Sequence, residues 1–179
     1  MDYFELCVDP LVSNPIQIQK IDGSVFKNHV TLEEFDAVPK MTVCYFDNSP
    51  QIEIYDILSQ PAFLISDKLK RLFALYDPEM QFKGIRVYAY DLEDNEAPLY
   101  WWPYIPFVDC LSTQATKYST GMLEHCVLDR SALPNRDIFR INGILENKIV
   151  ISLQVAESMI RRKMTGFTLK PIEFNEGTR

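Results

Sequence analysis

One pattern occurs twice in the chain: a short apolar run, a serine, and then a stretch with helical spacing of apolar residues. Residues 63–65 precede Ser66, and residues 149–151 precede Ser152. Serine favours helix starts because its hydroxyl accepts a backbone N–H that has no partner within the helix. Apolar residues then recur every three or four positions, which predicts a helix with one buried face. A strand-like segment follows each helix, so we predict two strand–helix–strand units.

Most of the other segments are typical of strands. They are rich in β-branched and aromatic residues, or they alternate polar and apolar positions. One further short helix is expected where Thr31 and Glu34 match a capping box. The predicted fold is therefore α+β, a mostly antiparallel β-sheet with two serine-capped units. The predicted strands are residues 42–46, 51–56, 85–90, 124–128 and 137–141.

The length and composition suit a small globular protein. The chain has 179 residues, of which 47% are hydrophobic and 24% charged. We expect residues 1–60 to form an acidic N-terminal part and residues 61–179 to form the α+β scaffold. One compact domain overall is the expected arrangement, with a separate subdomain at residues 1–60 as the alternative.

The net charge of −7 lies entirely in the first third of the chain. Residues 1–60 hold ten acidic and three basic residues, whereas residues 61–179 hold fifteen of each. Such a balance argues against a nucleic-acid partner. The acidic third is either a solvated surface or a docking surface for a basic protein, since complementary charge speeds association. The docking hypothesis names Asp22, Glu33, Glu34, Asp36, Asp47, Glu53 and Asp56.

The sequence holds no recognisable catalytic, metal-binding or cofactor-binding motif. Its six glycines are scattered, so no phosphate-binding loop can be written, and no G-x-S-x-G motif occurs. Without a signal peptide or an apolar run of membrane-spanning length, the chain is expected to be cytoplasmic and not bound to a membrane. In that compartment we expect the four cysteines to be reduced thiols. They are Cys7, Cys44, Cys110 and Cys126, with no C-x-x-C spacing.

An aromatic segment around Trp101 and Trp102 leaves a second class of function open. Adjacent residues of an extended segment point to opposite sides, so one tryptophan could be buried and the other exposed. With Tyr104, they could line an apolar pocket of a small-molecule-binding protein or an enzyme. A third class, a structural subunit of a homo-oligomer, is also compatible with the sequence.

Several segments together resemble a bacterial immunity-protein family of polymorphic toxin systems. The resemblance covers about residues 60–179 and is carried by residues 63–69, 81–85, 100–101, 108–111, 149–152 and 165–167. It implies a non-enzymatic protein that neutralises a cognate toxin by binding it, and a basic nuclease domain would be a suitable toxin for an acidic chain. The matched positions look like core and capping residues, so no functional residue is carried over.

Overall fold

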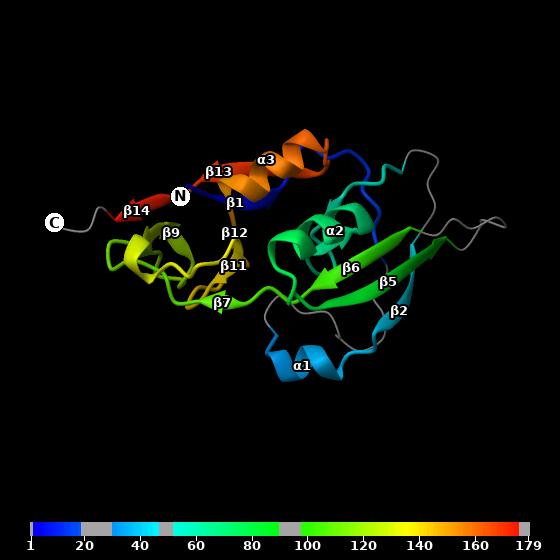
Figure 1. Ribbon diagram of the computed structural model, residues 1–179, viewed down its shortest axis with the longest axis horizontal. Coiled ribbons are helices and arrows are strands. Elements are labelled where there is room, and N and C mark those ends of the chain that lie inside the picture. Colours follow the sequence, from blue (N-terminus) through cyan, green and yellow to red (C-terminus); the bar gives the residue numbers. More distant parts are fainter. Residues whose placement is uncertain (1, 19–29, 47–51, 90–97, 176–179) are drawn as a thin grey trace. The chain divides into compact units, whose positions relative to one another are not determined.

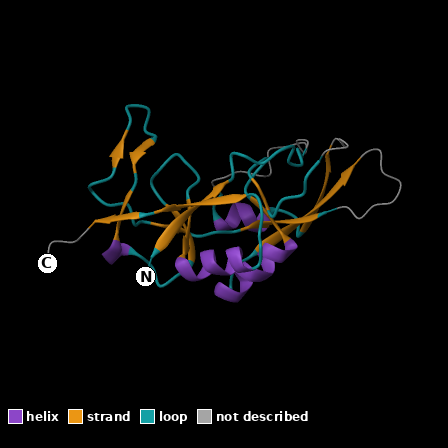
Figure 2. Cartoon of the chain, turned by 90° about the horizontal axis from the view of Figure 1, so that it is seen from above, coloured by secondary structure: helices purple, strands orange, loops and turns teal. Residues whose placement is uncertain are grey.

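The computed structural model describes residues 2–18, 30–46, 52–89 and 98–175, and it confirms the α+β class (Figure 1). Within these ranges strands predominate (Figure 2), and three short α-helices accompany them. Contacts divide the chain into two compact units. The first contains Met1–Cys7, Ile105–Arg162 and Thr168–Arg179, and the second contains Val8–Tyr104 and Lys163–Phe167.

The expected boundary near residue 60 falls inside the second unit. A distinct functional role for residues 1–60 stays a prediction. The backbone passes from one unit to the other at four places, so neither unit is a continuous piece of sequence.

The second unit is built on a five-stranded sheet in the order β2-β5-β6-β4-β3. β2 runs parallel to β5, and the other neighbours are antiparallel. Helix α1 (Leu32–Ala37) precedes β2, and α2 (Asp67–Tyr76) follows β4 directly. The strands are β2 (Met41–Phe46), β3 (Ile57–Leu58), β4 (Leu64–Ser66), β5 (Phe82–Ala89) and β6 (Leu99–Pro103).

One face of this sheet forms the core of the second unit. Alternate residues of the central strands, such as Ile85 and Val87, are fully buried there. Helix α1 contributes Phe35, whose ring centroid lies 5.1 Å from that of Trp102. Tyr100 shares this core and donates its hydroxyl to the carbonyl oxygen of Tyr55 at 2.8 Å.

The first unit contains a second five-stranded sheet, in the order β13-β1-β12-β11-β7. Helix α3 (Leu153–Arg161) follows β12, and a 3-10 helix η1 (Arg130–Ala132) follows β10. Tyr3, Phe139 and Val150 belong to its core. The sheet strands are β1 (Tyr3–Val8), β7 (Phe107–Val108), β11 (Ile138–Ile141), β12 (Ile149–Ser152) and β13 (Phe167–Pro171). Two strand pairs complete it, β8 (Thr116–Lys117) with β9 (Leu123–His125) and β10 (Val127–Asp129) with β14 (Glu173–Asn175).

The two serine-started helices share a tertiary contact as well as a sequence pattern. Ser66 accepts the N–H of Leu69 at 3.2 Å and donates its hydroxyl to Asp56 Oδ1 at 2.5 Å. Ser152 donates to Asp137 Oδ1 at the same distance, 2.5 Å. In each unit, the serine N–H also donates to the carbonyl oxygen of that aspartate at 2.8 Å. Each helix start is therefore joined to a preceding strand through one aspartate.

The strand predicted at residues 51–56 was wrong. Of the described residues in this range, only Glu53 makes a β-bridge, to Pro15, and the neighbouring strand β3 begins at Ile57. The alternation of polar and apolar residues does not give this stretch one buried face, since Ile54 is 65% exposed. Asp56 turns its carboxylate toward Ser66 and Thr165, and these side-chain bonds hold the end of the stretch.

Candidate functional site

The five predicted partner-binding acids that the structure describes lie at three separate locations of the second unit. Asp22 and Asp47 lie outside the described residues. Three of the others, Glu33, Glu34 and Asp36, lie together on α1. Glu53 and Asp56 lie between β2 and β3 in the chain, and each has specific partners. The five described acids therefore do not share one environment.

Helix α1 presents its acids to solvent because a single aromatic residue anchors it. Phe35 is the buried residue of the helix, while Glu33 and Asp36 are exposed. Glu34 has a structural role, because its Oε2 accepts the backbone N–H of Thr31 at 2.9 Å and thereby completes the capping box. Glu33 and Asp36 are therefore the α1 acids best placed to meet a partner.

Glu53 is exposed and contacts a small hydrogen-bonded group on the surface. Its carboxylate accepts the hydroxyl of Tyr55. The same hydroxyl lies 3.1 Å from the backbone N–H of Ser13, which donates to it. The negative charge of Glu53 is thus positioned by residues 13 and 55, and it remains accessible from outside.

Asp56 is a structural residue in this arrangement. Its Oδ1 accepts the Ser66 hydroxyl, and its Oδ2 accepts the backbone N–H of Thr165 at 2.8 Å. Thr165 Oγ1 also lies 3.3 Å from Oδ2. A half-buried carboxylate with both oxygens occupied is suited to holding the fold. This makes Asp56 the least suitable of the seven acids for binding a partner.

The sheet separates the aromatic residues proposed for a pocket. Trp102 is 1% exposed and faces the α1 side with Tyr104, whose ring centroid lies 5.4 Å from that of Phe35. Trp101 lies on the opposite face, where its Nε1–H donates to Asp67 Oδ1 at 3.0 Å. Its ring also receives the Lys70 ammonium, 4.5 Å from the centroid. The two tryptophans therefore contribute to different surroundings.

A cavity of about 330 Å³ lies elsewhere in the second unit. Its described lining consists of residues 8, 12, 15–18 and 57–60 and includes none of Trp101, Trp102 and Tyr104. The lining is mainly aliphatic, and its described polar side chains are Gln17, Ser59 and Gln60. Among these described residues there is no titratable group that could transfer a proton.

The four cysteines are free thiols in the structure. Burial raises the pKa of Cys44 to about 11 and that of Cys110 to about 12. Burial is also the main cause of the raised pKa values of Cys7 and Cys126. All four are therefore protonated at neutral pH, a state in which cysteine is a poor nucleophile and a poor metal ligand.

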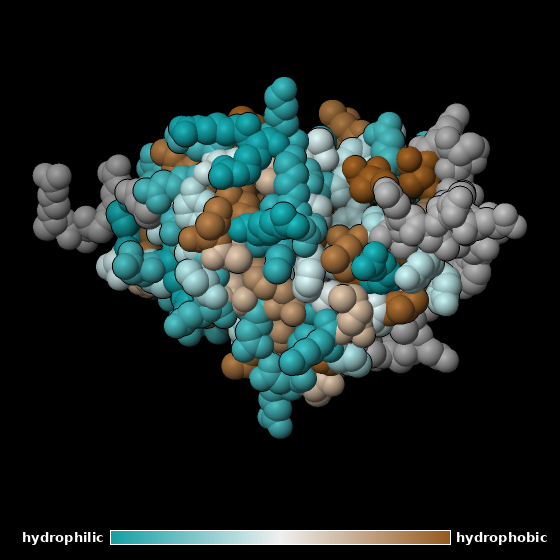
Figure 3. All heavy atoms as spheres, turned by 45° about the vertical axis from the view of Figure 1, so that its right-hand side comes forward, coloured by the Kyte–Doolittle hydropathy of each residue, from teal (hydrophilic) through white to brown (hydrophobic). Residues whose placement is uncertain are grey.

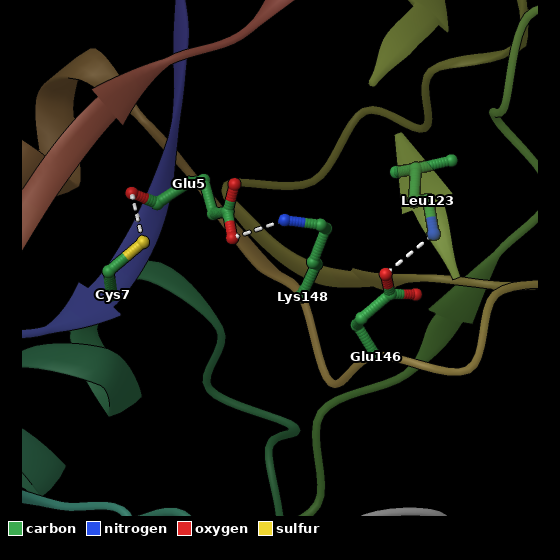
Figure 4. Close-up of polar contacts among 5 residues, drawn as sticks. All are labelled: Glu5, Cys7, Leu123, Glu146 and Lys148. Carbon is green, nitrogen blue, oxygen red and sulfur yellow. Dashed lines mark hydrogen bonds and ion pairs between the residues drawn. The ribbon is translucent and has the colours of Figure 1, made fainter. Parts of the chain in front are cut away.

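A largely buried ion pair of the first unit lies next to Cys7. The Lys148 ammonium faces the Glu5 carboxylate (Figure 4), with Nζ 2.7 Å from Oε1, and both side chains are largely buried. The carbonyl oxygen of Glu5 faces the Cys7 sulfur. Glu146, two residues before Lys148, accepts the backbone N–H of Leu123 with its carboxylate. The Lys148–Glu5 pair joins β1 to the segment before β12, and the Glu146 contact joins that segment to β9, so both have a structural role. In the described part of the chain, no group of three or more His, Cys, Asp or Glu residues could hold a metal ion.

Hydrophobic residues (brown) also lie among hydrophilic ones (teal) on the surface of the molecule (Figure 3). Three exposed apolar side chains belong to one strand: Met41, Val43 and Tyr45 of β2 are 44–47% exposed. Sequence reasoning missed this surface, because a strand with apolar residues on both faces looks like a fully buried strand. None of the helices in the described ranges is both long and apolar enough to cross a membrane.

Comparison with known proteins identifies a family for nearly the whole chain. The model of the Immunity protein family (Imm11) matches residues 10–173. The family resemblance seen in the sequence is thereby confirmed, and the match extends over the acidic N-terminal part as well. A search of curated proteins finds no match to this chain.

Proposed function

The chain belongs to the Immunity protein family (Imm11), and from this premise we propose that it protects against a toxin by binding that toxin directly, without catalysis. Family membership is the observation that carries the proposal, since it points to an immunity role. The protonated thiols and the aliphatic lining of the cavity agree with a protein that acts by contact. Four free thiols also fit a reducing compartment, so we propose a cytoplasmic location.

We further propose that acidic residues attract the toxin. Glu33 and Asp36 are exposed on α1, Glu53 is exposed nearby in sequence, and the chain carries a net charge of −7. A basic toxin, such as a nuclease domain that binds nucleic acid, would approach such a protein faster than a neutral one would. Asp22 and Asp47 belong to this proposal by sequence alone. Asp56 does not, because its carboxylate already holds Ser66 and Thr165.

The test uses the cognate toxin domain, sought among the genes that flank this one and prepared in a catalytically inactive form. Association and dissociation are measured by stopped flow or surface plasmon resonance at low and high salt. The variant Glu33→Lys/Asp36→Lys should associate roughly tenfold more slowly at low salt, with a weaker salt dependence. The matched control is Glu79→Lys/Glu157→Lys, which changes the net charge equally at exposed acids outside α1.

Two outcomes would refute separate parts of the proposal. If the parent chain neither binds the toxin domain nor inhibits the active toxin, direct neutralisation is wrong. If the α1 variant and the control associate equally fast, the acids of α1 have no specific role and only net charge matters.

A further inference from the structure

The cavity of the second unit has an aliphatic interior and a polar mouth. Its buried lining residues are all aliphatic and at most 8% exposed: Ile16, Ile18, Ile57 and Leu58. The polar side chains that line it belong to Gln17, Ser59 and Gln60, and all three residues are exposed. Small-molecule sites combine an apolar lining with a few polar groups in this way. The cavity therefore suits a ligand that is apolar at one end and polar at the other.

Two chain segments form the walls of the cavity, and contacts outside the cavity hold each of them. Residues 8–18 supply one wall. The backbone N–H of Glu53 donates to the carbonyl oxygen of Asn14 at 3.1 Å, and Pro15 forms a β-bridge with Glu53. The other wall is β3 with the two residues after it, and β3 is paired with β4. Walls that are fixed in the free protein lower the cost of ordering a site when a ligand binds.

The polar side chains at the mouth are available to a ligand. Within the described part of the chain, those of Gln17, Ser59 and Gln60 form no hydrogen bond with another protein group. An amide offers donors and an acceptor, and a hydroxyl offers both roles as well. None of the described lining side chains carries a charge, so a charged head group would lose hydration without gaining an opposite charge. This chemistry favours an uncharged head group that forms hydrogen bonds.

The volume of the cavity limits the size of the ligand. A water molecule occupies about 30 Å³ of the liquid, and a methylene group is of similar size. The cavity of about 330 Å³ therefore has room for roughly eleven such groups. A linear chain of about eight to ten carbons with one head group fills this space.

We propose that the cavity is a binding site for a small molecule with an aliphatic chain of this length and an uncharged head group, such as an alcohol or an amide. The chain lies against the buried aliphatic residues, and the head group binds Gln17 and Gln60 at the mouth. This activity is separate from the neutralisation of a toxin, so either proposal can fail without the other. An inserted toxin side chain is a poorer occupant, because a leucine or isoleucine side chain is far smaller than the cavity.

The main test is isothermal titration calorimetry of the full chain with a series of linear alcohols. Octan-1-ol should bind with a dissociation constant below about 1 mM. Each methylene added to hexan-1-ol should lower the dissociation constant about fourfold, until the cavity is filled near decan-1-ol. Binding that strengthens equally beyond this length would show nonspecific adsorption and overturn the proposal. If no alcohol binds up to its solubility limit, the cavity is not a ligand site.

The head group is tested with octanoate and octylammonium at pH 7. Both should bind more weakly than octan-1-ol, because a charged group loses hydration at an uncharged mouth. Tighter binding of either ion would contradict the uncharged head group. The double variant Gln17→Ala/Gln60→Ala should bind octan-1-ol roughly tenfold more weakly. Gln114→Ala, at an exposed amide of the first unit, is the matched control and should bind it as the parent does.

Filling the cavity tests its location. Val12 lines the cavity and is half-buried, so Val12→Trp should weaken octan-1-ol binding at least tenfold. Leu11→Trp is the matched control, since Leu11 is 87% exposed and is not among the described lining residues. Circular dichroism establishes that both variants fold. Equal affinity of folded Val12→Trp and the parent would place the ligand elsewhere and overturn the proposal. If the parent binds no alcohol, and Val12→Trp alone loses the toxin, the cavity receives a toxin side chain instead.

Discussion

Replacing Ser152 by alanine removes two interactions at the start of α3. The helix loses its N-cap acceptor for the Val155 N–H, which is worth about 0.5–2 kcal/mol. The half-buried Asp137 carboxylate loses the hydroxyl 2.5 Å away, and a hydrogen bond to a charged group is worth about 1.5–3 kcal/mol. Because Ser152 is fully buried, water cannot readily replace its hydroxyl. We therefore expect the free energy of unfolding to fall by about 2–4 kcal/mol.

The corresponding change at Ser66 should be milder. Ser66 is half-buried, and Asp56 keeps the Thr165 N–H as a donor after the hydroxyl is removed. We expect a loss of about 1–2 kcal/mol there, close to that of an ordinary N-cap. The contrast between the two serines tests the aspartate contact as distinct from the cap alone.

Urea unfolding measures both effects. Both tryptophans of the chain, Trp101 and Trp102, belong to the second unit, so their fluorescence follows the unit that contains Ser66. Far-UV circular dichroism follows both units. A double-mutant cycle of Ser152→Ala with Asp137→Ala should give a coupling energy of at least about 1 kcal/mol. Strict additivity of the two changes, or a loss below about 0.5 kcal/mol for Ser152→Ala, would show that the reasoning is wrong.

Three other measurements test features of the fold. Since burial raises the pKa of Cys44 to about 11, a thiol reagent at pH 8 should modify it slowly in the folded chain, and all four cysteines should react in denaturant. Burial lowers the pKa of Lys148, but its bond to Glu5 and the charge of Glu5 raise it more, so the net shift is upward. Stability from this pair should be complete below the unfolded lysine pKa, about 10.4, and decline as pH rises through the higher folded value; Lys148→Met should abolish that decline. Gly166→Ala should destabilise more than Gly143→Ala, because both have positive φ but only Gly166 would bring a Cβ to 2.8 Å from Tyr55; equal unfolding midpoints would contradict this.

Local features of the sequence predicted the helices well. α2 begins after Ser66 and α3 after Ser152, where a capping residue meets an apolar stripe. Both signals lie within one or two turns of the chain, so they need no knowledge of distant contacts. The opposite orientation of Trp101 and Trp102 also follows from local geometry, since side chains alternate along a strand.

The contacts that join distant segments could not be read in the same way. Asp56 precedes Ile57, which pairs with Ile65 directly before Ser66. In the same way, Asp137 precedes Ile138, which pairs with Ile151 directly before Ser152. The shared Asp-Ile dipeptide was a usable signal, but nothing local tells whether the aspartate binds a serine or faces solvent. The exposure of the β2 side chains could not be predicted from the sequence either, because the topology of the fold decides which side of the sheet a helix covers.

The four crossings of the backbone between the two units have a consequence for synthesis on the ribosome. The second unit consists mostly of Val8–Tyr104, but it also needs Lys163–Phe167. That late segment supplies the Thr165 N–H to Asp56 and the Gly166 carbonyl oxygen to the N–H of Asp9. Domains usually fold in the order in which they emerge. Here the earlier-made unit cannot form these two contacts until Lys163–Phe167 has left the ribosome, so we expect its completion to follow the synthesis of most of the first unit.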